Sequence, residues 1–327
     1  MAVTHPIAER SEWILECDDL AVSIGETEVL SSLTLRLARG ESLGVVGETG
    51  AGKSLACRTM IGLLGRIGGR VSRGRLVFDG RDLTNASESD WRRLRGREIA
   101  FVPQASLSGL DPIMTVGRQL IETIRVLTNH PNPRARAEEL LELVDMPRAD
   151  QVMRAYPHEL SGGMRQRAMI ALAVAGDPTL LIADEPTTAL DVTVQKLVLE
   201  LLMSLVKTTS MSLVLVTHDL AVVQEHTDST AIMYAGETVE IGRTPAVLVG
   251  DGHPYTRALL GSGPTRMRAG ERLAAIGGSP PSPTEWPPGC RFAPRCSYAT
   301  QECRTTRPAA VSERSIRCLR LSEIRNG

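Results

Sequence analysis

Runs typical of strands and of helices follow one another along most of the chain. In residues 14–47, the stretches ILECDDLAVSI, LTLRLAR and SLGVVG have the apolar and β-branched content of short strands. Leu55 to Leu64 then has the three- and four-residue apolar spacing of a helix, and GRLVFDG resumes the strand pattern. This part is therefore predicted to be rich in strands, with one helix directly after the third.

A long helical region follows, from about Thr115 to Glu159, in which VGRQLIETIRVL and RARAEELLELV repeat apolar residues every three or four positions. Two continuous apolar runs, TLLIAD and SLVLVT, then resemble parallel strands buried on both faces, and each precedes a helical pattern. TAIMYAG and ETVEIGR close the region as two short, hairpin-like strands. Together these patterns predict an α/β fold with a parallel-sheet core and a helical insertion.

The composition changes beyond Gly261. The stretch GSGPTRMRAGERLAAIGGSPPSPTEWPPG is dominated by Gly, Pro, Ser and Arg, which indicates a linker with little regular structure, and a compact tail follows. We therefore expect a large domain over residues 1–261 and an extension over residues 262–327. From Arg291 onward the tail has eight arginines against three glutamates, a run that is most often a solvated surface; an anionic cluster and anionic lipid are the alternative neighbours.

Length and charge narrow the class of protein. The chain has 327 residues and a formal net charge of −1, which argues against a general nucleic-acid binder. No apolar run reaches the 18 or so residues of a membrane span, and the polar N-terminus MAVTHPIAERSEWILE does not resemble a signal peptide. We expect a cytoplasmic protein whose membrane role, if any, comes through a partner.

The stretch GETGAGKS has the spacing of the phosphate-binding loop G-x-x-x-x-G-K-[ST]. Glycines let the backbone N–H groups turn toward phosphates, the lysine places a charge at the β- and γ-phosphates, and the serine hydroxyl can ligate Mg²⁺. The alternative is a glycine turn joining a strand to a helix. The predicted nucleotide-binding residues are Gly47, Glu48, Thr49, Gly50, Ala51, Gly52, Lys53 and Ser54.

A second candidate for phosphoryl-transfer chemistry is TLLIADE, a buried strand that ends in two acids. Asp184 is placed to hold Mg²⁺, and Glu185 is placed to polarise an attacking water as general base. The alternative is a pair of acids that cap a helix after a strand.

Between these two motifs lies LSGGM, and with it the sequence resembles the ATP-binding subunit of an ABC transporter. The resemblance implies that Ser161, Gly162 and Gly163 present a hydroxyl, backbone amides and a helix N-terminus to the γ-phosphate of ATP held by another subunit. Two such domains would then sandwich two nucleotides head to tail.

Further family marks follow in the expected order. The resemblance implies that Gln104 in FVPQ contacts Mg²⁺ and the attacking water, that Asp191 in ALD couples the two sites, and that His218 in VTHD contacts the γ-phosphate. An aromatic residue usually stacks on adenine near the end of the first strand. Here Ile24 stands at that position, so apolar contact with the base is expected without π stacking.

The variant signature LSGGMRQR, with YPHE before it and HPYTRALL after it, resembles the oligopeptide/dipeptide importer branch, which includes nickel importers. The likeness extends from about Ile14 to Cys318. It implies a P-loop NTPase ABC cassette with a parallel-sheet core, an antiparallel β subdomain, a helical subdomain over about 105–160 and a small cysteine-containing extension. ATP and Mg²⁺ are the implied cofactors.

The resemblance also implies partners and a location. They are two membrane permease subunits, a second ABC ATPase subunit that is a paralogue or the same chain, and an extracytoplasmic substrate-binding protein. The chain would lie peripherally on the cytoplasmic face of the cell membrane and power peptide import, with nickel import as an alternative.

Six cysteines fall into two groups. Cys17 and Cys57 lie in apolar settings and are interpreted as core residues. The other four have the spacing C-x5-C-x6-C-x14-C, which lacks the C-x2-C pairs that zinc ribbons prefer. A [4Fe–4S] cluster is favoured, with Zn²⁺, disulfides and unligated thiols as alternatives. The candidate ligands are Cys290, Cys296, Cys303 and Cys318.

Two further functions are alternatives to transport. Soluble ABC ATPases that act on DNA or ribosomes carry long insertions or two fused cassettes, whereas here 56 positions separate Gln104 from Ser161 and one phosphate loop is present. A non-hydrolysing cassette would have a degenerate site, whereas Glu185 and His218 are both present. A transport ATPase is therefore favoured.

Overall fold

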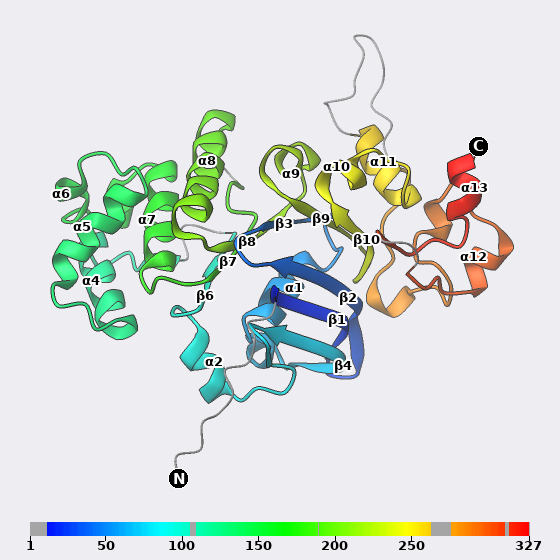
Figure 1. The fold of residues 1–327 in the computed structure, drawn as a ribbon, viewed down its shortest axis with the longest axis horizontal. Coiled ribbons are helices and arrows are strands. Elements are labelled where there is room, and N and C mark those ends of the chain that lie inside the picture. Colours follow the sequence, from blue (N-terminus) through cyan, green and yellow to red (C-terminus); the bar gives the residue numbers. More distant parts are fainter. Residues whose placement is uncertain (1–11, 105–108, 189, 263–275, 311–313, 327) are drawn as a thin grey trace.

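The computed structural model describes residues 12–104, 109–188, 190–262, 276–310 and 314–326 (Figure 1). In this part of the chain eleven strands form one sheet in the order β5-β4-β1-β2-β10-β9-β3-β8-β7-β6, with β11 beside β10. The strands are β1 Trp13–Ile24, β2 Thr27–Ala38, β3 Ser42–Val46, β4 Gly69–Phe78, β5 Arg81–Asp82, β6 Ile99–Val102, β7 Leu180–Asp184, β8 Ser212–Thr217, β9 Ser229–Tyr234, β10 Glu237–Arg243 and β11 Ser315–Ile316.

The sheet has a parallel half and an antiparallel half. Strands β9, β3, β8, β7 and β6 pair in parallel, and every residue of β3, β7 and β8 is buried, as their continuous apolar runs predict. Strands β2, β1, β4 and β5 pair antiparallel. The α/β fold with a parallel core is confirmed, although β1 and β2 have 12 residues each and are longer than the short strands expected.

Helices cover the sheet and form a separate lobe at one end of it (Figure 1). In that lobe α4, α5 and α7 pack around one hydrophobic cluster, which confirms the helical insertion. Helix α1 instead packs its apolar face against both halves of the sheet. The helices are α1 Lys53–Met60, α2 Glu88–Leu94, α4 Val116–Leu127, α5 Pro133–Leu143, α6 Ala149–Val152, α7 Gly162–Val174, α8 Val192–Thr209, α9 Leu220–His226, α10 Thr244–Leu248, α11 Pro254–Ser262, α12 Gln301–Thr305 and α13 Leu321–Asn326.

The helices of the described ranges were also compared with the length and hydropathy of a membrane span. None of them is both long enough and apolar enough to cross a bilayer.

The extension beyond residue 276 packs on the strands of the main domain. Strand β11 pairs with β10, and Phe292 and Trp286 join a cluster that contains Tyr234 and Tyr255. Residues 263–275 of the predicted linker lie outside the described residues. In its described part, residues 276–289, the regular structure is one 3₁₀ turn at Pro283–Glu285, which agrees with the expectation of little regular structure, and α12, β11 and α13 belong to the compact tail beyond it.

The interpretation of the tail arginines as a solvated surface is wrong for several of them. Arg291 is only 3% exposed. Three others form ion pairs with carboxylates of the main domain: Arg295 with Glu48, Arg307 with Glu237, and Arg314 with Asp251. These side chains turn inward because the main domain offers acidic partners under the tail, which local sequence does not reveal.

Candidate active site

The phosphate-binding motif forms the turn between β3 and α1, in the position that such a loop requires. Gly50 and Gly52 have φ values of +85° and +97°, in the left-handed region that favours glycine. At Gly47 an added Cβ would lie 2.2 Å from the carbonyl oxygen of Met233. The N-terminus of α1 has no side-chain cap, so its N–H groups remain available to an anion.

Lys53 connects this loop with the acidic end of β7. Its side chain is 6% exposed, its Nζ donates to the carbonyl oxygens of Gly47 at 2.8 Å and Glu48 at 3.4 Å, and it lies 3.5 Å from Glu185 Oε1. The ammonium is therefore held among oxygens at the start of α1, which is where the phosphates of a nucleotide would be bound.

Glu185 is the residue on which the predicted catalytic side chains converge. Its Oε2 accepts hydrogen bonds from Gln104 Nε2 and Thr188 Oγ1, both at 3.0 Å, and lies 3.6 Å from His218 Nδ1. With φ = 45°, Glu185 is a non-glycine residue in the left-handed region, a conformation that costs about 1–3 kcal/mol and is common at functional sites. The main-chain turn aims this carboxylate at Lys53.

Asp184 lies beside the phosphate loop and has a buried carboxylate oxygen without a hydrogen-bond partner among the described residues. The residue is 5% exposed, and its Oδ1 has no hydrogen-bond partner in the described part of the chain. Burial raises the pKa of Asp184, and a side-chain hydrogen bond with Ser54 opposes that rise. A buried carboxylate oxygen without a partner, next to a serine hydroxyl, fits the oxygen ligands that Mg²⁺ requires.

These side chains meet because their strands are parallel. Lys53 follows β3, Gln104 follows β6, Asp184 ends β7 and His218 follows β8. Parallel strands put their carboxyl ends on one edge, which is where open α/β sheets bind ligands. The structure therefore brings together the phosphate loop, both acids, the glutamine and the histidine.

The signature residues lie on the helical lobe rather than at this edge (Figure 1). Ser161 caps α7 by accepting the N–H of Met164, and α7 begins at Gly162. At Gly163 an added Cβ would lie 2.6 Å from Val194 Cγ1, so α7 and α8 approach closely there. Ser161 is exposed, which leaves this helix N-terminus open to another molecule.

Two remaining candidates lie at element ends. Asp191 caps α8 by accepting the N–H of Val194 at 3.0 Å, and it is exposed. Ile24 ends β1 and pairs with Thr27 and Gly69 on either side. Its half-buried side chain offers apolar surface but no ring.

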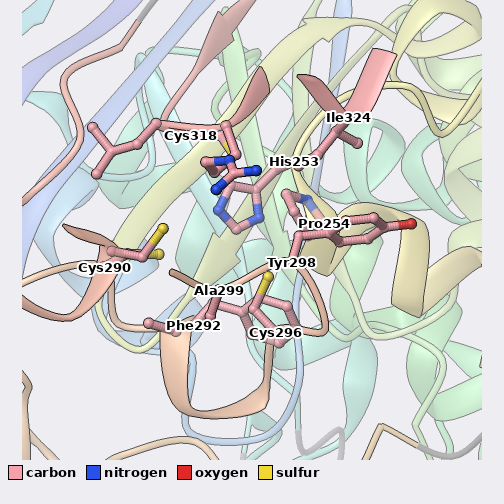
Figure 2. A pocket seen from close by; sticks show the side chains of 13 residues that line it. His253, Pro254, Cys290, Phe292, Cys296, Tyr298, Ala299, Cys318 and Ile324 are labelled. Carbon is pink, nitrogen blue, oxygen red and sulfur yellow. The ribbon is translucent and has the colours of Figure 1, made fainter. Parts of the chain in front are cut away.

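The four tail cysteines line one pocket, together with His253 and Phe292 (Figure 2). All four are free thiols. Burial raises the pKa of Cys290 to about 12 and also raises the pKa of Cys296 and Cys318. In the described residues no three His, Cys, Asp or Glu side chains are grouped closely enough to hold a metal ion. Cys17 and Cys57 are buried core residues, as predicted.

Sequence reasoning missed two groups that support the site. Thr188 lies three residues after Glu185, and its hydroxyl could have been suspected from that spacing. The hydroxyl of Tyr255, in the HPY motif, accepts the N–H of Glu48 at 2.9 Å. His253 of the same motif is fully buried, its Nδ1 accepts the N–H of Tyr255 at 3.1 Å, and burial lowers its pKa to about 3.

This fold and this arrangement of a phosphate loop, two acids and a separate signature helix define an ATP-binding cassette. Residues 30–188 match the ABC transporter family model, and residues 239–303 match that of the oligopeptide/dipeptide transporter, C-terminal region. The chain belongs to the ABC transporter ATPases that carry this C-terminal region.

Relatives match over nearly the whole chain. The oligopeptide transport ATP-binding protein AppD of Bacillus subtilis (strain 168) is 43% identical over 296 residues, 89% of each chain. The dipeptide transport ATP-binding protein DppD of Escherichia coli (strain K12) is 43% identical over 302 residues, which are 90% of this chain and 92% of that protein. The cassette MJ0796, in a dimeric post-hydrolysis state with ADP and Pi, has a TM-score of 0.60 at 25% identity, covering 70% of this chain and 98% of its own.

Proposed function

We propose that this ATPase powers the import of di- or oligopeptides through separate membrane permease subunits. The observation that carries the catalytic part is the convergence of Gln104, Thr188, His218 and Lys53 on Glu185. The peptide part is supported by the names of the relatives that match over about nine-tenths of the chain, and by the match of residues 239–303 to the oligopeptide/dipeptide transporter, C-terminal region.

In the proposed mechanism the residues of this chain bind the nucleotide and orient a water molecule. Gly47 to Ser54 would hold the phosphates of ATP, with Mg²⁺ held by Ser54, Gln104 and Asp184; the ion would neutralise charge on the phosphates. Glu185 would accept a proton from the attacking water, and His218 would contact the γ-phosphate. Gln104 and Thr188 would keep the carboxylate of Glu185 in place.

We propose further that a second cassette completes the site. The exposed Ser161 and the start of α7 lie on the helical lobe, so they would serve ATP bound by a partner cassette, and Asp191 would couple the two sites. Apolar contact of Ile24 with adenine also remains a proposal. The transporter would include two permease subunits and an extracytoplasmic substrate-binding protein, with this chain on the cytoplasmic face.

For the tail, we propose that Cys290, Cys296, Cys303 and Cys318 bind an iron–sulfur cluster, with Zn²⁺ as the alternative. The four thiols share one pocket, and a bound cation would favour the thiolate forms that burial disfavours. Binding would require the sulfurs to draw together. If a cluster is bound, anaerobically purified protein should be brown; colourless protein with one zinc per chain would favour Zn²⁺.

We also propose that the chain divides into a domain over residues 1–261 and an extension over residues 262–327.

Transport tests the proposed function directly. Cells that rely on this transporter for an essential peptide should lose uptake when Lys53 is changed to Ala, because no ammonium would then face the phosphates. Wild-type peptide uptake by the Lys53→Ala strain would contradict the proposal. If a strain that lacks the gene took up peptides normally but lost nickel uptake, the proposed substrate would change from peptides to nickel.

A further inference from the structure

The phosphate loop is held from outside the cassette by the C-terminal extension. Glu48, the second residue of the loop, receives a two-pronged ion pair from Arg295: Nη1 to Oε2 at 2.6 Å and Nη2 to Oε1 at 3.0 Å. These residues are 247 positions apart. The N–H of Glu48 is bound as well, by the hydroxyl of Tyr255. Both the backbone and the side chain of one loop residue are therefore fixed by later parts of the chain.

Arg295 is built into its place with all its hydrogen-bonding capacity used. Its side chain is 5% exposed, and a guanidinium has five N–H donors. They match five acceptors: the two carboxylate oxygens of Glu48, the hydroxyl of Tyr234 and the carbonyl oxygens of Ile276 and Gly277. An arginine so placed cannot swing away without breaking the whole set, so Glu48 is held by a rigid partner.

The charge of Glu48 gives this contact a consequence for nucleotide binding. Its side chain is 26% exposed and lies in a loop that must receive the negative phosphates of ATP. Without Arg295, an unpaired carboxylate in that loop would repel them, and the loop would lose one anchor. Arg295 both neutralises and positions this residue.

We propose that Arg295 is a positioning residue of the nucleotide site, acting through Glu48, so that the C-terminal extension is needed for tight ATP binding. This inference rests on the proposed role of Gly47 to Ser54 as the phosphate loop. It assigns to the extension a contribution to the nucleotide site that does not depend on what the cysteine pocket binds.

The test is nucleotide affinity of the full chain, measured by titration with a fluorescent ATP analogue and Mg²⁺. Arg295→Met should weaken binding roughly tenfold, and Arg295→Lys should recover only part of the loss, because a single ammonium cannot replace a fork of donors. Arg307→Met is the matched control. It removes a different tail-to-core ion pair, with Glu237, that does not touch the loop, and it should leave affinity unchanged.

A double variant separates a specific clamp from a general loss of folding. Glu48→Gln/Arg295→Met should bind nucleotide no more weakly than Arg295→Met alone, because the unpaired carboxylate is gone. The inference would be overturned if the two substitutions lowered nucleotide affinity additively. It would also be overturned if Arg295→Met lowered the melting temperature but bound nucleotide as tightly as Arg307→Met does. If Lys53→Ala also left binding unchanged, the phosphate-loop assignment itself would fail.

Discussion

The carboxyl edge of the parallel strands and the joint between the extension and the main domain both bury charge, but they treat it differently. At the edge, Asp184 keeps a buried oxygen without a partner among the described residues, and Lys53 lies among oxygens in a glycine loop. At the joint, every donor of Arg295 has an acceptor. The carboxylate oxygen of Asp184 is therefore available to a ligand, whereas the donors of Arg295 are all used within the protein.

The largest effect should come from Glu185, at the carboxyl edge of the parallel strands. We expect Glu185→Gln to lower the turnover number for ATP about 10²–10⁴-fold in the assembled transporter, because the amide cannot accept the proton of water. ATP binding should persist, as measured by nucleotide retention. Glu41→Gln is a control, since Glu41 pairs with Arg243 elsewhere. Turnover at the wild-type rate would remove Glu185 as the base.

Arg291, another residue of the joint, should respond through stability instead. Arg291→Ala is expected to lower the free energy of unfolding by about 2–3 kcal/mol, because Arg291 donates to the buried carbonyl of Ala235 and stacks 3.2 Å from the ring centroid of Trp286. Urea unfolding measures the change. Arg304→Ala, at an exposed tail position, is the control and should cost under about 0.5 kcal/mol. Equal losses of unfolding free energy in both variants would contradict the stabilising role of Arg291.

A smaller effect with the opposite sign is expected at Asp184. Above its raised pKa the buried carboxylate is ionised and destabilises the fold, so Asp184→Asn should stabilise the nucleotide-free protein by about 1 kcal/mol at neutral pH. The gain should vanish as the pH falls below that pKa, where the wild-type carboxyl is neutral too. Urea unfolding at several pH values measures it, and the same variant should lose Mg²⁺-dependent hydrolysis. A less stable variant at neutral pH would refute this reading.

The smallest effect concerns contact with the adenine ring of ATP. Ile24→Tyr should tighten ATP binding about threefold to tenfold, because an aromatic ring adds stacking to the existing apolar contact. Ile24→Leu keeps the contact without a ring and should bind ATP as the wild type does. An unchanged affinity in the tyrosine variant, measured with the same fluorescent analogue, would place adenine elsewhere.

The positions of the residues at the carboxyl edge could be predicted because these residues follow strands that are easily recognised in the sequence. Apolar runs locate β3, β7 and β8, and parallel pairing then requires Lys53, Asp184 and His218 to share one end of the sheet. The joint could not be predicted in this way. Arg295 and Glu48 belong to unrelated local patterns, and only tertiary packing makes them partners. The same limit explains why the tail arginines were misread as a solvated surface.

The strand order has a consequence for how the protein is made. Strand β3, from the first fifty residues, pairs with β8 on one side and β9 on the other. A ribosome must therefore have released residues up to about Tyr234 before β3 has both neighbours, and up to Arg295 before Glu48 has its partner. Contacts so distant in sequence form late and slowly. A nascent chain would thus expose an unfinished phosphate loop for most of its synthesis, and full nucleotide affinity would arise only near the end of translation.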